Sequence, residues 1–142
     1  MARCEADRDS KKKPGMLNSY SMRAVRIYKG TFVFVHCEDG LAHNHGDITS
    51  DNNMFVGVAF IGVDNSHGVA GGASVIVESE GVYEFLAEDA TQKWVGQAVY
   101  AVDDQTVTTD MFVDDEFAVH VGYVTEFVDS RTVRVRIDNA VC

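Results

Sequence analysis

Short apolar runs separated by polar turns fill the chain from Arg23 onward. Valine and phenylalanine are frequent in these runs, and both residues favour β-strands. The pattern predicts strands at 22–28, 31–37, 54–63, 73–79, 82–87, 97–102, 105–109, 117–127 and 131–138. A short helical turn is predicted only within residues 88–94. The chain is therefore predicted to be all-β, folding as a small β-barrel or sandwich.

Two of these runs predict different surroundings for their strands. Residues 131–137 alternate strictly between apolar and polar side chains, which indicates one buried face and one exposed face. Residues 32–35 are apolar on both faces, which indicates burial on both sides. One side of that strand is expected to face the core and the other a neighbouring subunit. Phe32 and Phe34 are therefore candidates for an oligomer interface.

A Val-Gly pair followed five residues later by Val-Asp occurs three times, starting at Val56, Val95 and Val121. The copies are 39 and 26 residues apart, so a solenoid with a fixed period is excluded. We interpret them as three similar hairpins of one barrel or sandwich, with the glycine at a β-bulge. A phosphate-binding glycine loop is disfavoured because no matching spacing follows.

Residues 1–20 differ from the rest of the chain. They are polar, lack hydrophobic periodicity and contain the sequence Lys-Lys-Lys-Pro-Gly at 11–15. We expect an extended, basic N-terminal arm at 1–20 and a single β domain at 21–142. The residues of the arm and its junction that are expected to contact a partner protein or a neighbouring subunit are Lys11, Lys12, Lys13, Met16, Leu17, Tyr20 and Arg23.

The charge of the chain is unevenly distributed. Residues 1–30 contain eight basic and three acidic residues, whereas residues 31–142 contain four basic and nineteen acidic residues. A basic segment ahead of an acidic body is typical of an interaction tail. The acidic body disfavours nucleic acid as a partner because phosphate groups repel it.

The composition of the chain limits where the protein is expected to be made and which enzyme classes it could belong to. No apolar run approaches the length of a membrane span, so no membrane partner is expected. No signal peptide is visible, so synthesis in a cytoplasm is expected. The three cysteines are odd in number, which disfavours a disulfide framework. No serine-nucleophile elbow or P-loop occurs, and neighbouring His36 and Cys37 would point to opposite faces of a strand. The protein is therefore not expected to be an enzyme.

Metal-binding residue types cluster around a long polar loop predicted at 38–53. His43 and His45 form an HxH pair, as in a cupin-type metal site. The further glycine, glutamate and histidine of such a site are missing, so we expect a polar loop with two exposed histidines and no metal or other cofactor. Acidic groups at 103–104, 110 and 114–116 could attract calcium, but solvated turns are the favoured interpretation.

Several segments, taken in order, resemble bacteriophage capsid decoration proteins, also called head cement proteins. The similar segments are Trp94-Val95-Gly96-Gln97-Ala98-Val99-Tyr100, Asp103-Asp104, Thr106-Val107-Thr108, Val121-Gly122-Tyr123-Val124 and Thr132-Val133-Arg134-Val135-Arg136-Ile137-Asp138. The resemblance covers about residues 22–138. It implies a small, usually trimeric β-barrel on the outside of a phage head. It provides no catalytic residues.

The resemblance makes the major capsid protein and further copies of this chain the expected partners. The expected function is to bind the outer surface of a phage capsid and stabilise it as a trimer that bridges capsid subunits. The alternatives are a carbohydrate- or protein-binding β module of a virion and, less favoured, a small cupin-type metal enzyme.

Overall fold

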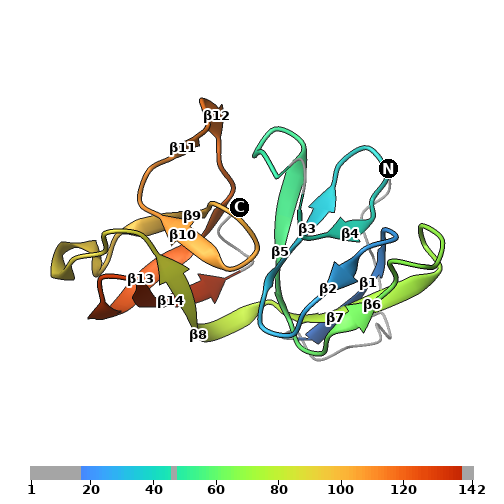
Figure 1. The fold of residues 1–142 in the computed structure, drawn as a ribbon, viewed down its shortest axis with the longest axis horizontal. Coiled ribbons are helices and arrows are strands. Elements are labelled where there is room, and N and C mark those ends of the chain that lie inside the picture. Colours follow the sequence, from blue (N-terminus) through green and yellow to red (C-terminus); the bar gives the residue numbers. More distant parts are fainter. Residues whose placement is uncertain (1–16, 46–47, 139–142) are drawn as a thin grey trace, which may run out of the picture.

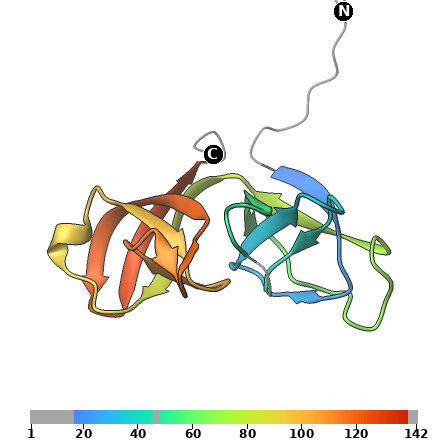
Figure 2. The same cartoon turned by 90° about the horizontal axis from the view of Figure 1, so that it is seen from above.

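The computed structural model describes residues 17–45 and 48–138, and their regular structure is almost entirely β-strand. Ten strands close into two five-stranded barrels that lie side by side (Figures 1 and 2). The first barrel contains β1 (Leu17–Met22), β3 (Phe32–His36), β4 (Ala42–His43), β5 (Asn53–Ala59) and β7 (Ala73–Glu78). The second contains β8 (Glu80–Ala87), β9 (Ala98–Ala101), β10 (Thr106–Thr108), β13 (His120–Asp129) and β14 (Thr132–Asp138). The all-β prediction is confirmed, with two barrels in place of one.

The remaining elements are short. β2 (Arg26–Ile27) pairs with β6 (Val63–Asp64), and β11 (Phe112–Val113) pairs with β12 (Glu116–Phe117) in a hairpin that stands away from the second barrel (Figure 1). A single turn of 3₁₀ helix, η1 (Gln92–Trp94), lies within the predicted helical turn. In the part of the chain that the structure describes, no helix is long and apolar enough to cross a membrane.

The second barrel repeats the strand order and directions of the first. β1 pairs in parallel with β4 and antiparallel with β7, and β8 pairs in the same two ways with β10 and β14. In both barrels the remaining neighbours are antiparallel: β3 lies between β4 and β5, and β9 lies between β10 and β13. The two barrels are therefore structural repeats in tandem.

Two of the three Val-Gly motifs occupy the same place in the two barrels. Gly57 of β5 and Gly122 of β13 each lie at a β-bulge opposite the neighbouring strand, as expected from the sequence. A Cβ atom at either glycine would lie 2.2 Å from a backbone carbonyl oxygen, that of Glu78 or that of Arg136. The motif at Val95 lies in the turn before β9, so only two copies mark equivalent strands.

Strand β3 contributes side chains to both hydrophobic cores. Val33 is fully buried in the core of the first barrel, whereas Phe32 and Phe34 belong to the core of the second. The Phe32 ring stacks on Phe85 of β8 with 4.1 Å between centroids. Both phenylalanines are 0% exposed within one chain. Their burial corrects the expectation of an oligomer interface, because the chain's own second barrel covers the outer face of this strand.

The barrels are joined by a single residue, Ser79, between β7 and β8. The Tyr83 hydroxyl donates a hydrogen bond to the Glu78 carboxylate beside this junction. Burial and the nearby Glu78 carboxylate raise the pKa of Tyr83, so its hydroxyl keeps its proton. The short connection and the shared core restrict how far one barrel can move against the other.

Strand β1 begins at Leu17, before the expected end of the N-terminal arm at residue 20. All six residues of β1 pair antiparallel with β7. Met22 is fully buried, and Tyr20 packs against the same core. The boundary at residue 20 is therefore corrected: residues 17–20 form barrel wall, and residues 1–16 lie outside the described part of the chain. The serines that alternate with these side chains obscured the strand in the sequence.

Candidate functional site

The residues expected to contact the capsid or a neighbouring subunit separate into two groups. Lys11, Lys12, Lys13 and Met16 lie outside the described residues. Leu17 and Tyr20 are half-buried in β1 and support the first barrel. Arg23 follows β1, and its Nε donates to Asp39 Oδ2 at 2.8 Å. The pKa of Asp39 is lowered by the Leu41 backbone N–H and by Arg23, so the two side chains form an ion pair.

The histidine-containing loop does not form a metal site in the described structure. His43 is 0% exposed, which corrects the expectation that both histidines of the HxH pair are exposed. Its Nδ1 lies 3.0 Å from the His45 carbonyl oxygen, and its Nε2 lies 2.6 Å from Asn53 Oδ1. Within residues 17–45 and 48–138, no three His, Cys, Asp or Glu side chains are placed to hold a metal ion.

The burial of His43 predicts a pH dependence of stability. Desolvation lowers the pKa of His43 below its ordinary value of 6.5, although the contacts with Asn53 and His45 oppose the shift. Below pH 6.5 the unfolded chain therefore binds a proton more readily than the folded protein. The free energy of unfolding should fall as the pH is lowered from 7 towards 5.

This prediction is tested by urea unfolding between pH 5 and 7. His43→Gln should flatten the pH profile, and His45→Gln, which replaces an exposed histidine, is the matched control. The difference between the two profiles isolates His43 from the acidic groups. Equal slopes for both variants and the wild type would contradict the prediction.

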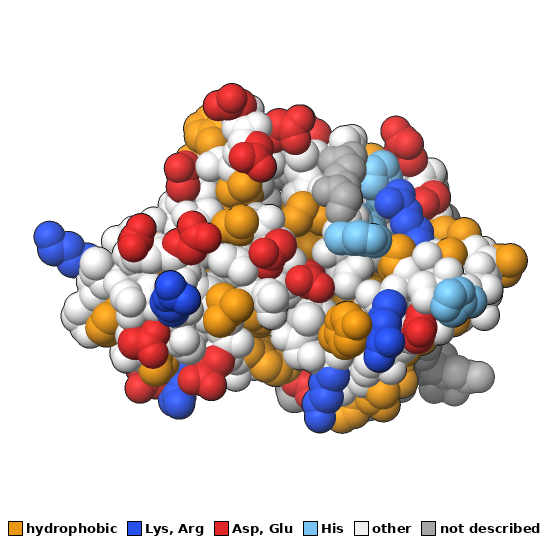
Figure 3. All heavy atoms as spheres, in the orientation of Figure 1, with side chains coloured by type: hydrophobic (Ala, Val, Ile, Leu, Met, Phe, Trp, Pro, Cys, Tyr) orange, Lys and Arg blue, Asp and Glu red, His pale blue; other side chains and the backbone are white. Residues whose placement is uncertain are grey.

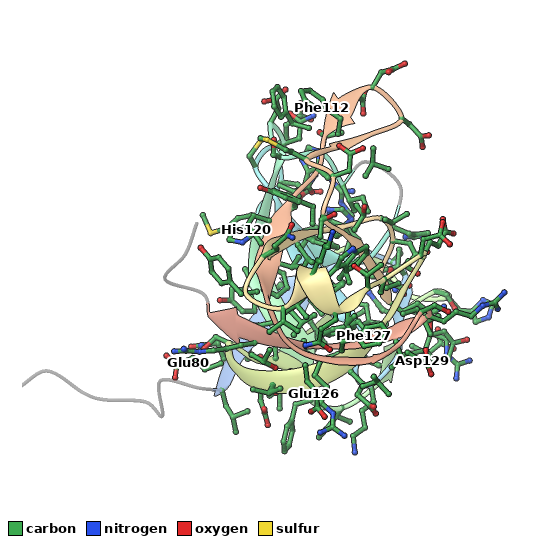
Figure 4. The ribbon with its side chains drawn as sticks, turned by 90° about the vertical axis from the view of Figure 1, so that its left-hand side faces the viewer. Glu80, Phe112, His120, Glu126, Phe127 and Asp129 are labelled. Carbon is green, nitrogen blue, oxygen red and sulfur yellow. The ribbon has the colours of Figure 1, made fainter. Side chains whose placement is uncertain are left out.

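The β11–β12 hairpin presents two exposed aromatic side chains that lie against each other. The Phe112 and Phe117 rings pair across the strands with 4.4 Å between centroids. They are 48% and 50% exposed, and neighbouring Met111 is 45% exposed. Figure 4 shows Phe112 at the outer end of the molecule, well away from His120 and Phe127 on β13. Exposed aromatic clusters of this kind are typical of protein interaction sites.

The turn of the hairpin is built from acidic residues in an unusual conformation. Asp114 and Asp115 have φ values of 53° and 65°, so both central residues are left-handed, as in a type I′ turn. Aspartate tolerates this conformation better than most residues that carry a Cβ atom. The sequence pattern predicted strands at 105–109 and 117–127 but did not predict the hairpin, because each hairpin strand is only two residues long.

The base of the hairpin is attached to the first barrel. The Ser50 N–H donates to the Phe117 carbonyl oxygen at 2.9 Å, and Thr49 forms an isolated bridge with Ala118. The hairpin is thus held by backbone contacts at its base while its aromatic rings face outward. A fixed backbone lowers the entropic cost of ordering these rings against a partner.

Comparison with known families adds the decisive observation. A family model described as phage cement protein matches residues 25–138. The chain belongs to this family. The match covers the second barrel, the hairpin and the first barrel except β1, and it agrees with the resemblance to head cement proteins. No curated protein and no solved structure matches the chain.

Membership of the family defines the general role of the protein. Phage cement proteins are structural proteins rather than enzymes, and they are components of the virion associated with the capsid. The exposed aromatic hairpin agrees with that role.

Proposed function

We propose that this protein binds the outer surface of an assembled phage head through the β11–β12 hairpin and stabilises the shell. The partner is the major capsid protein. The observation that supports this proposal is the exposed Phe112–Phe117 pair, because a few buried aromatic residues supply most of the binding energy of protein interfaces. The family match supports a capsid partner over a carbohydrate.

The stabilisation follows from mass action. A protein that binds across neighbouring subunits of the shell, and not to free subunits, shifts the equilibrium towards the assembled state. Copies joined as a trimer would make each further contact effectively intramolecular. The support for a trimer is the resemblance to decoration proteins, and its contacts must use surfaces other than Phe32 and Phe34.

The proposal predicts that Phe112→Ala with Phe117→Ala abolishes most of the binding to heads. An aromatic side chain at the centre of an interface contributes about 2 kcal/mol or more, so the double variant should bind at least about 30-fold more weakly. The measurement is co-sedimentation of purified protein with expanded, undecorated heads over a range of protein concentrations.

Phe60→Ala is the matched control, because Phe60 is 42% exposed on the first barrel and lies outside the hairpin. It should bind heads like the wild type. Both variants should unfold at wild-type urea concentrations. If the hairpin variant binds as tightly as the wild type, the hairpin is not the capsid-binding surface.

A further inference from the structure

A groove of about 600 Å³ lies between the two barrels, beside the hairpin. One wall consists of residues 24–28 and the loop around Asn44 of the first barrel. The other wall consists of the β9–β10 turn and the hairpin of the second barrel. The volume is sufficient for several side chains of an extended peptide.

The groove carries a strong excess of negative charge. Four carboxylates line it, at Asp103, Asp104, Asp114 and Glu116, and Arg26 is the one Lys or Arg side chain among its described lining residues. Arg26 already lies 3.9 Å from Asp64 and over the Tyr28 ring. Figure 3 shows acidic side chains gathered over the hairpin and the second barrel. Because no three acidic or His groups among the described residues converge on a metal site, these charges suit several spaced cations better than one metal ion.

Asn44 provides a second and independent indication of a ligand. Its side chain lines the groove and is 6% exposed. Its Nδ2 donates to the Arg26 carbonyl oxygen at 3.0 Å and to Asp104 Oδ2 at 3.2 Å. Its buried Oδ1 accepts no hydrogen bond from the described structure. An unsatisfied buried acceptor is costly, and an ammonium or backbone N–H group entering the groove would relieve that cost.

Apolar side chains border the same groove. Tyr28 is 55% exposed on the side of the first barrel, and Phe117 is 50% exposed on the side of the hairpin. A groove with carboxylates between aromatic edges matches the aliphatic stem and charged end of lysine. The ligand chemistry that fits is therefore a lysine-containing extended polypeptide.

We propose that the occupant is the N-terminal segment, residues 1–16, of a second copy of this chain, with Lys11, Lys12 and Lys13 placed among the groove carboxylates. The described residues include seven basic and eighteen acidic side chains, whereas residues 1–16 include five basic and three acidic ones. The segment is thus the part of the chain with complementary charge. Sixteen extended residues span up to roughly 50 Å, which is enough to reach a neighbouring molecule.

The geometry favours a second copy over the chain's own segment. Figure 2 shows β1, to which the segment is attached, along the upper edge of the view, and the β9–β10 turn along the lower edge. The turn that lines one wall of the groove and the start of β1 therefore lie on opposite sides of this view. This contact goes beyond the proposed function, since it joins copies of the cement protein to one another and is testable without heads.

The test is carbodiimide cross-linking, which joins a lysine amine directly to a carboxylate it contacts. Full-length protein labelled with ¹⁵N is mixed with unlabelled protein, cross-linked at high concentration and digested for mass spectrometry. We expect peptides that join Lys11, Lys12 or Lys13 to residues 103–116, with one labelled and one unlabelled partner. Their yield should fall as salt is raised, because the charges are screened.

Two sets of variants control the experiment. Neutralisation by Asp103→Asn, Asp114→Asn and Glu116→Gln leaves the Asp104 and Asp110 carboxylates able to react, and it should lower the yield of mixed links to those two residues at least about tenfold. Glu80→Gln with Glu88→Gln, which neutralises exposed carboxylates outside the groove, should not lower it. Cross-links found only between two labelled peptides or between two unlabelled peptides would show that each segment binds its own chain. That result would overturn the proposal. Mixed links that persist in the groove variant would also overturn it.

Discussion

Gly57→Ala is expected to destabilise the protein by about 2–6 kcal/mol, from crowding of roughly 1–3 kcal/mol and backbone strain of similar size. The new Cβ atom would lie 2.2 Å from the Glu78 carbonyl oxygen and 2.8 Å from its carbonyl carbon. These are backbone atoms of β7, so they can move away only if the sheet itself shifts. The φ of Gly57 is 142°, a value that residues with side chains rarely adopt.

Guanidinium unfolding monitored by circular dichroism measures this effect. Gly122→Ala should also be strongly destabilising, because its Cβ would lie 2.2 Å from the Arg136 carbonyl oxygen in the second barrel. Gly96→Ala is the matched control: its φ is 87°, but nothing lies within 4 Å of the added atom. It should cost only about 1–2 kcal/mol, the usual cost of a left-handed residue with a Cβ atom. Equal effects at Gly57 and Gly96 would show that close packing does not set the requirement for glycine.

Phe32→Ala is expected to destabilise the protein by about 3–5 kcal/mol, the range for removing a fully buried phenylalanine. The ring stacks on Phe85 and meets Phe55 edge-on with 5.6 Å between centroids. Its loss leaves a cavity where the first barrel packs into the core of the second. Because Phe32 links the two barrels, we also expect the wild type to unfold in a single transition and the variant to unfold in a broader or divided one.

Differential scanning calorimetry, together with guanidinium unfolding at several protein concentrations, tests this prediction. Phe112→Ala, in the exposed hairpin, is the control and should change stability by no more than about 0.5 kcal/mol. The destabilisation by Phe32→Ala should not depend on protein concentration, because the contact lies within one chain. A marked concentration dependence would instead place Phe32 between subunits, as the sequence analysis expected.

The alternation of residues 131–137 was sufficient to predict which side chains are buried. Val133, Val135 and Ile137 are at most 1% exposed, whereas Arg134 and Arg136 are exposed. The burial of Phe32, Val33 and Phe34 was also correctly predicted, although Val35 is only partly buried and the covering surface was not predicted. The same apolar pattern is compatible with a neighbouring subunit or with a second barrel of the same chain, because hydrophobic burial has no preferred partner.

The hairpin and the groove illustrate what the sequence pattern leaves open. The hairpin strands are two residues long, too short to show alternation, and a type I′ turn at Asp114-Asp115 lacks the glycine that usually marks such a turn. Asn44 and Asp104 are 60 residues apart in the chain, yet their side chains are 3.2 Å apart across the groove. Contacts at that separation depend on how the barrels pack together.

The sequence by itself determined that the chain is all-β, which faces of its clearest strands are buried and which family it resembles, because these properties follow from local side-chain periodicity and residue chemistry. Only the tertiary structure decided that the strands close into two repeated barrels, that Phe32 and Phe34 join them, that His43 is buried and that Phe112 and Phe117 remain exposed. The physical reason is that strand pairing and core packing join residues far apart in the chain, and local periodicity carries no information about which distant partner is chosen.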